Sequence, residues 1–131
     1  MNPIQQALQL VNQRRAALQL APACLDQRLV RGARYWLALC QGRDRWRTEF
    51  ADQEPWNAIT SAPLEFELTW LLVTTTPASV EASVEQWFRT GKQHAALTDL
   101  SHIGLALEQN HNNWHWVIYT ANPVARKQIW W

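Results

Sequence analysis

The N-terminal part of the chain carries two stretches in which apolar residues recur at helical spacing. Asn2-Pro3 is typical of a helix start, with Asn as the N-cap and Pro at the first helical position. A second helix is expected from Asp26 to Cys40, with Gly42 as its stop. Two amphipathic helices joined by a short link predict a helical layer that packs on another layer. The apolar stripe of the first helix is Ile4, Ala7, Leu8, Val11 and Leu18.

The second half of the chain mixes strand and helix patterns. Apolar and polar residues alternate over Leu64–Thr75, which predicts a strand. A third helix is expected to begin at Thr76-Pro77 and to end at Thr90-Gly91, and a helical turn should follow from His94 to Leu97. Two more strands are expected on either side of Asn110–Asn113, which is typical turn material. These strands are His102–Glu108 and Trp114–Thr120.

The hairpin at the C-terminal end is the most regular part of the pattern, and the crossover before the first strand is the least regular. In the hairpin, alternation groups the apolar residues of the two strands on one face. These residues are Ile103, Leu105, Leu107, Trp114, Trp116 and Ile118. Arg43–Pro63 shows no period, and it is expected to be a loop-rich crossover with one short helix over 52–60.

Composition narrows the class of protein. The chain has 131 residues, of which 47% are hydrophobic and 18% charged, so we expect one globular domain over residues 1–131. The net charge is +1 and there is no basic block, which argues against a nucleic-acid or anionic-membrane partner. No apolar run approaches the ~20 residues of a membrane-spanning helix.

Tryptophan is unusually frequent, with nine in the chain. A tryptophan supplies a large apolar area and one N–H group that needs a partner. One interpretation is a core built on tryptophan. The other is that some of these rings line a ligand surface or an interface. The candidates for the second role are Trp46, Trp56, Trp130 and Trp131.

The two cysteines are expected to be free thiols. The helix predicted between Cys24 and Cys40 would hold them roughly 20 Å apart, well beyond the ~7 Å limit for a disulfide. Free thiols are typical of a reducing compartment. The N-terminus MNPIQQALQL also lacks the basic start and apolar core of a signal peptide. These two features favour the cytoplasm, unless the sequence is a trimmed mature form.

Several short motifs occur in a consistent order. The first helix carries an apolar stripe followed by N-x-x-R, at Asn12 and Arg15. The second helix carries L-x-x-x-A, at Leu29 and Ala33, followed by the aromatic pair Tyr35-Trp36. The later motifs are Trp87-Phe-Arg-Thr90, His94, Ile103-Gly104 and the aromatic strand Trp114–Tyr119.

In this order the motifs resemble the CAP superfamily (cysteine-rich secretory proteins, antigen 5 and pathogenesis-related 1 proteins), in particular its short bacterial SCP-like members. The resemblance implies an α+β fold, a three-layer α-β-α sandwich with helices on both faces of a small, mainly antiparallel sheet. It also implies roles in defence or in lipid and small-molecule binding, and an exported protein, whereas the cysteines and N-terminus favour the cytoplasm.

Many members of this superfamily can hold a divalent metal in a central cleft with two His and two acidic side chains. The match here is incomplete. His94 matches the His that follows the tryptophan helix, although one residue further on, and Glu67 (with Glu65 as the alternative) matches an acidic residue on the preceding strand. His102 replaces the acidic residue before Ile103, the first His has no counterpart within Arg43–Phe50, and the hallmark cysteines of the eukaryotic members are absent.

Three functions follow from these features. The first is a non-catalytic CAP-like domain without a cofactor, which binds a small ligand or a protein partner at a cleft formed by His94, Glu67, His102, Glu65 and Thr90. The second is a degenerate metal-dependent hydrolase in which Zn²⁺ is held by His94, His102 and Glu67. The third is a module that forms a homodimer through tryptophans such as Trp130 and Trp131.

The sequence favours a binding domain over an enzyme. Ser101 or Thr90 near His94 could be combined into a nucleophile and base, but no G-x-S-x-G elbow supports the pair. The chain also has only four glycines, which leaves little backbone for a phosphate or oxyanion nest.

Overall fold

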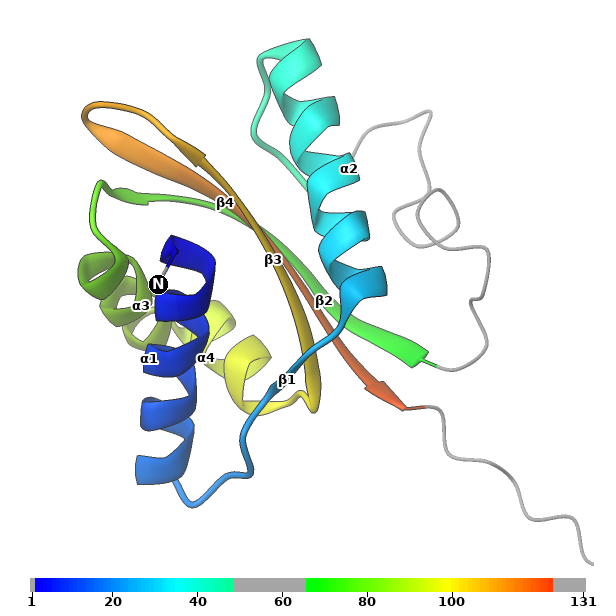
Figure 1. The fold of residues 1–131 in the computed structure, drawn as a ribbon, viewed down its shortest axis with the longest axis vertical. Helices are drawn as coiled ribbons and strands as arrows, with labels where there is room; N and C mark the ends of the chain where they lie inside the picture. Colours follow the sequence, from blue (N-terminus) through cyan, green and yellow to red (C-terminus); the bar gives the residue numbers. More distant parts are fainter. Residues whose placement is uncertain (1, 49–65, 124–131) are drawn as a thin grey trace, which may run out of the picture.

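A computed structural model of the chain describes residues 2–48 and 66–123. Its elements, in chain order, are α1 (Pro3–Ala17), β1 (Cys24–Leu25), α2 (Gln27–Arg43), β2 (Phe66–Pro77), α3 (Val80–Arg89), α4 (Gly91–Thr98), β3 (His102–Gln109) and β4 (Asn113–Pro123). Helices α1, α3 and α4 cover one face of the sheet, and α2 covers the other (Figure 1). The expected three-layer α-β-α sandwich is therefore confirmed.

The sheet has the strand order β1-β3-β4-β2. β4 pairs antiparallel with β3 on one side and with β2 on the other. β1 adds a short parallel pair at the start of β3, where Cys24 lies opposite His102 and Leu25 opposite Ile103. The sheet is thus mainly antiparallel, as expected, although β1 itself did not show in the sequence pattern.

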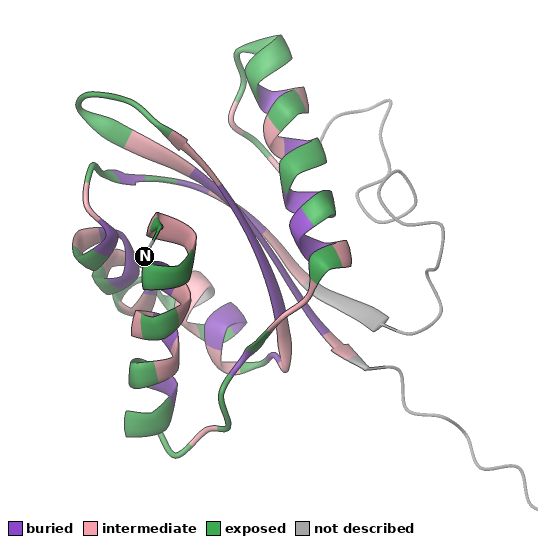
Figure 2. Ribbon diagram, in the orientation of Figure 1, coloured by how far each residue is buried: buried purple, intermediate pink, exposed green. Residues whose placement is uncertain are grey.

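Two hydrophobic clusters hold the layers together, one on each face of the sheet, and the buried residues run along its centre (Figure 2). The cluster beneath α1, α3 and α4 contains Trp87 and Trp116, whose rings are perpendicular with centroids 4.8 Å apart. The cluster beneath α2 contains Trp36 and Tyr119. All four rings are fully buried. The hairpin alternation is confirmed, because Ile103 and its apolar partners all face the first cluster.

The remaining described tryptophans also pack on these clusters. Trp70 and Trp114 are half-buried against the first, and Trp46 is half-buried against the second. Trp46 also stacks on His115, with ring centroids 4.0 Å apart. The core interpretation is therefore confirmed for the fully buried Trp36, Trp87 and Trp116, and a role of the half-buried Trp46 at a ligand surface or interface stays a prediction. Three tryptophans lie outside the described residues, namely Trp56, Trp130 and Trp131, so the dimer hypothesis stays a prediction. Glu65 and the short helix predicted over 52–60 also lie outside the described residues.

The N-x-x-R motif of α1 forms hydrogen bonds that hold the helix to other segments of the fold. The Asn12 side chain pairs with the backbone of Ala23: its Oδ1 accepts from the Ala23 N–H at 2.7 Å, and its Nδ2 donates to the Ala23 carbonyl at 3.3 Å. The Arg15 guanidinium is buried and donates to the carbonyls of Ala21 (2.9 Å), Leu97 (2.6 Å) and Leu100 (3.0 Å). The motif thus ties α1 to the segment just before β1 and to the last turn of α4 and the residues after it.

Several element boundaries differ from those expected. β4 continues past Thr120 to Pro123, and Leu18, expected on the apolar stripe of the first helix, follows the end of α1 and is exposed. α2 continues through Gly42 to Arg43, because the left-handed residue that ends it is Asp44, with φ 51°. β2 continues to Pro77, since it stays paired with β4 there. α3 therefore begins at Val80 and not at Thr76-Pro77, with Ser79 as its N-cap. α4 begins at Gly91, earlier than the turn expected from His94.

Both cysteines are free, as expected. Cys24 is exposed on β1, whereas Cys40 is buried beneath α2. Burial raises the pKa of the Cys40 thiol. Within residues 2–48 and 66–123, no helix has the length and apolar character needed to cross a bilayer.

Asp26 joins β1 to α2, and its substitution gives a first testable prediction. Its side chain accepts from the backbone N–H of Arg28 at 2.8 Å and lies 3.3 Å from the Arg28 guanidinium. Burial acts to raise the pKa of Asp26, but the hydrogen bonds and charge of Arg28 outweigh it, so the pKa lies below its ordinary value. We expect Asp26→Ala to lower the free energy of unfolding by about 1 kcal/mol at pH 7.

The pH dependence of that loss follows from the depressed pKa. The stabilisation by Asp26 is present above the unfolded-state pKa of about 3.9 and is lost as the pH falls through the folded-state value. Urea unfolding at pH 7 and near pH 3 should therefore show a smaller difference between wild type and variant in acid. Asp99→Ala, at an exposed position after α4, is the control. An equal loss at both pH values would contradict the role of the ionised cap.

Candidate functional site

His94 lies on α4, on the side of the sheet that also carries α1 and α3. Its imidazole meets the Phe88 ring edge-on, with centroids 5.8 Å apart. On the other side of this contact, the Arg14 guanidinium carbon lies 5.8 Å from the centroid of the same Phe88 ring. The three side chains come from α4, α3 and α1, so they form a polar and aromatic cluster at the junction of three helices. We call Arg14, Phe88 and His94 the α1–α3–α4 cluster.

A groove of about 280 Å³ adjoins this cluster between α1 and α3. Its apolar lining is Leu10 and Val84, and its charged lining is Arg14 on one helix with Glu81 and Glu85 on the other. Because Arg14 belongs to both the groove and the cluster, His94 is one aromatic ring away from the groove. The groove therefore offers a short apolar floor between one cation and two carboxylates.

His102 lies on the opposite face of the sheet from His94. Ile103 packs into the cluster beneath α1, α3 and α4, so its neighbour His102 belongs to the other face by the alternation of a strand. The pairing agrees, since His102 lies directly opposite Ala121, which is part of the cluster beneath α2. The His102 Nδ1 is 2.7 Å from the Ser101 Oγ. The fold therefore separates the two histidines instead of bringing them to one metal.

The acidic candidates are less fully described. The backbone of Glu67 lies opposite Asn122 of β4, and β2 contacts α4, so its strand reaches the side of the sheet near His94. That the Glu67 side chain shares a cleft with His94 stays a prediction. Within the described ranges, no group of three or more His, Cys, Asp or Glu side chains is close enough together to hold a metal ion.

Thr90 acts mainly at the junction of two helices. It is the last cap of α3 and the first of α4, and its backbone carbonyl accepts from the His94 N–H at 2.8 Å. Its hydroxyl is bonded to the Gln86 carbonyl and to Gln93 Oε1, at 3.2 and 2.7 Å. Thr90 thus sets the position of His94 through the backbone, as the residue that starts the helix on which His94 lies.

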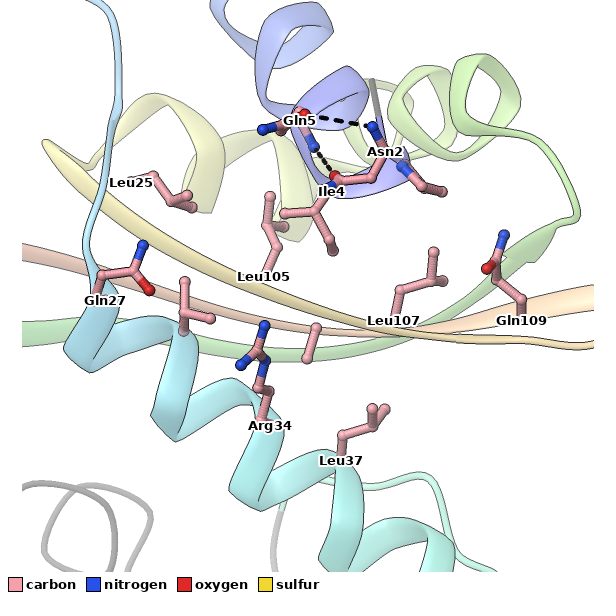
Figure 3. Close-up of a pocket in the computed structure, with 13 residues that line it drawn as sticks. Asn2, Ile4, Gln5, Leu25, Gln27, Arg34, Leu37, Leu105, Leu107 and Gln109 are labelled. Atoms are coloured by element: carbon pink, nitrogen blue, oxygen red, sulfur yellow. Dashed lines mark hydrogen bonds between the residues drawn. The ribbon is translucent and has the colours of Figure 1, made fainter.

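A second groove was not foreseen from the sequence. It has a volume of about 490 Å³ and lies between the start of α1 and the first turns of α2, along the outer edge of β3 (Figure 3). Arg34 of α2 is the charged side chain among its described lining residues. The sequence pattern held no signal for it, because the groove depends on β1 being only two residues long.

Comparison with known proteins settles the family. The model of the cysteine-rich secretory protein family, CAP, matches residues 8–122. The chain belongs to the CAP family. The part of this CAP domain that the family model covers contains all the motifs that carried the resemblance. A search of curated proteins found no match.

Solved structures show the same fold at low sequence identity. An outer surface protein of Borrelia burgdorferi is 16% identical, with a TM-score of 0.79 and 92% of each chain covered. A cysteine-rich secretory protein of Staphylococcus aureus is 15% identical with a TM-score of 0.64, and an extracellular SCP-domain protein of Bacillus anthracis is 11% identical with a TM-score of 0.63. These two matches include 91% and 88% of this chain, but only 38% and 39% of the longer S. aureus and B. anthracis chains.

Proposed function

We propose that this CAP domain is a non-catalytic binding domain that takes up a small ligand or a protein segment at the groove beside His94. The observation that carries the proposal is the continuity from the groove between α1 and α3, through Arg14 and Phe88, to His94. A groove with an apolar floor and a few charged groups at its rim is typical of a site for a small amphipathic ligand.

The charges at the rim suggest what such a ligand carries. Arg14 is exposed and can pair with an anion, while Glu81 and Glu85, also exposed, can pair with a cation. The apolar floor of Leu10 and Val84 suits a ring or a short alkyl chain. An aromatic ring with a charged substituent therefore matches both the apolar floor and the charged rim of the groove. A negative substituent would lie beside Arg14, and a positive one beside Glu81 and Glu85.

The test uses two matched probes, phenylacetate and phenethylamine, titrated into ¹⁵N-labelled protein. We expect amide shift changes to cluster at Leu10, Arg14, Val84 and Glu85, with dissociation constants on the order of millimolar for probes of this size. Arg14→Ala should reduce the response to phenylacetate but leave the response to phenethylamine. The matched control is Arg34→Ala, which removes an exposed arginine from α2 on the far side of α1.

His94 has its own readout in the same titration. Its ring contacts Phe88, so its Cε1–H signal should move when either probe enters the groove. Shift changes confined to other surfaces, or the same response in wild type and Arg14→Ala for both probes, would refute the proposal.

A further inference from the structure

One edge of the sheet ends its pairing part-way along a strand. β1 pairs with β3 only at His102 and Ile103, and the last bond of this pair runs from the Asp26 N–H to the Ile103 carbonyl at 3.1 Å. At Gln27 the chain turns into α2 and leaves the sheet. From Gly104 onward, the outer edge of β3 has no strand partner among the described residues.

The backbone groups on this edge can be assigned residue by residue. Along a strand, the N–H and C=O groups of alternate residues point to the same side. The Ile103 carbonyl points to the outer edge, since it accepts from Asp26. The N–H and C=O groups of Leu105, Leu107 and Gln109 therefore face outward as well, while those of the residues between them face β4. This leaves a row of backbone donors and acceptors about 13 Å long.

The groove of about 490 Å³ lies directly over this row. It is lined by three consecutive residues of β3, Leu105, Ala106 and Leu107, whose side chains leave the strand on both faces of the sheet. A cavity that touches both faces of one strand must lie at the edge of that strand. Figure 3 shows the start of α1 on one side of this edge and α2, with Arg34, on the other.

We propose that this edge of β3 binds an extended segment of a partner protein as an added strand, continuing from where β1 leaves off, with an acidic side chain of the segment beside Arg34. The backbone row supplies hydrogen bonds that do not depend on the partner's sequence, and the two flanking walls select its side chains. Alternate side chains of an added strand point to opposite faces. One set would lie against Ile4, Leu105 and Leu107, and the other against Val30, Arg34 and Leu37.

The chemistry of the walls defines the segment. The wall on the side of α1 is apolar at Ile4 and Leu105, which favours β-branched or aliphatic side chains at alternate positions. On the side of α2, Arg34 is exposed, and the described lining includes no carboxylate. Charge complementarity therefore places an acidic residue of the segment on that side.

A single extended chain fits this edge better than a second copy of the protein. The edge lies between two helices, so β3 of another copy would bring its own α1 and α2 into the same space. A lone strand has no such flanking helices. The proposal concerns a different surface from the groove beside His94, and it stands whether or not that groove binds a ligand.

The experiment uses the full chain with three acetylated, amidated pentapeptides. The first alternates valine and glutamate, the second alternates valine and lysine, and the third is the Val/Glu peptide with its alternate, edge-facing amide nitrogens methylated. Amide hydrogen exchange is followed by NMR with and without each peptide. In the free protein, the Leu105 and Leu107 amides should exchange much faster than those of Gly104 and Ala106, which face β4.

We expect the Val/Glu peptide to slow exchange at Leu105 and Leu107 at least tenfold, and the methylated peptide to have no such effect because it cannot complete the backbone bonds. Arg34→Glu should weaken Val/Glu binding about fivefold and strengthen Val/Lys binding, as expected for one exposed ion pair. Arg45→Glu is the control, because it makes an equal change of charge at an exposed arginine that lines neither groove, and it should change neither affinity.

Four results would overturn the proposal. One is equal binding of the methylated peptide, which would mean that the backbone row is not used. Another is protection of Leu105 and Leu107 in dilute free protein, which would mean that the chain itself covers the edge. The third is protection that grows with protein concentration, which would assign the edge to a second copy. The last is the absence of any effect of the Val/Glu peptide at millimolar concentration.

Discussion

Gly104→Ala should lower the free energy of unfolding by about 3 kcal/mol, the upper end of the usual cost of overpacking. A Cβ on Gly104 would overlap the backbone of α2 at Leu29 and Val30. The overlap is with backbone atoms, which cannot move out of the way as the end of a flexible side chain can. The helix would have to shift away from β3 and loosen the cluster beneath it.

Urea unfolding followed by circular dichroism measures this effect. With a slope of about 1.5 kcal/mol per molar urea, a loss of this size lowers the midpoint by about 2 M. The control is Gly42→Ala, since a Cβ at Gly42 in the exposed last turn of α2 would meet nothing within 4 Å. Ala is the better helix former, so this variant should gain about 0.5–1 kcal/mol. Equal midpoints for the two variants would show that α2 does not lie as close to β3 as described.

The Gly104 contact joins two motifs that are distant in this sequence. The L-x-x-x-A motif provides Leu29 and Ala33 on the buried side of α2, and Ile103-Gly104 provides the strand beneath it. Gly104 lets the helix backbone approach at Leu29, and Ala33 keeps the next turn close. The two motifs are distant in sequence but form one interface between α2 and β3.

The sequence predicted the elements that form by local pattern. The hairpin of β3 and β4 was expected with its correct inward face, because apolar and polar residues alternate there without interruption. The start of α1 at Asn2-Pro3 was also correct, and Asn2 and Gln5 form a reciprocal capping box. In both places, propensity and burial favour the same conformation.

The elements that depend on distant pairing could not be predicted. β1 has two residues and no period of its own, so only its pairing with His102 and Ile103 makes it a strand. β2 continues past Thr75 because β4 is long enough to pair with it as far as Pro77. The pairing register of β2 with β4 also shifts between Leu68 and Trp70, which no local pattern announces.

In the candidate site, too, the parts that depend on contacts between distant segments could not be predicted. His94 was singled out by its place after the tryptophan helix, and its role as a site residue stays a prediction. Its neighbours Phe88 and Arg14 come from two other helices, so their meeting is a property of the packing. The position of His102 on the opposite face follows from the alternation with Ile103. The sequence alone did not reveal it, because it did not show which helix covers which face.

Arg15→Met should cost about 3 kcal/mol of stability, although Met nearly matches the length and volume of the arginine stem. Arg15 is 3% exposed, and its guanidinium donates to the carbonyls of Ala21, Leu97 and Leu100. A buried carbonyl that loses its donor costs on the order of 1–3 kcal/mol. Leu97 lies in the last turn of α4, where the helix itself leaves carbonyls without donors, and Leu100 follows directly after the helix. Burial lowers the pKa of Arg15, but the guanidinium stays protonated at neutral pH.

The loss should be concentrated where Arg15 makes its bonds. Native-state hydrogen exchange should show faster opening of α4 in the variant, and the urea midpoint should fall. Arg15→Lys should recover only part of the stability, because one ammonium group cannot reach carbonyls that a planar fork meets from three nitrogens. The neighbour Arg14 is exposed, so Arg14→Met controls for the loss of one positive charge on α1 and should change stability by no more than about 0.5 kcal/mol. If Arg15→Met is as stable as Arg14→Met, then the N-x-x-R motif does not hold α1 to α4.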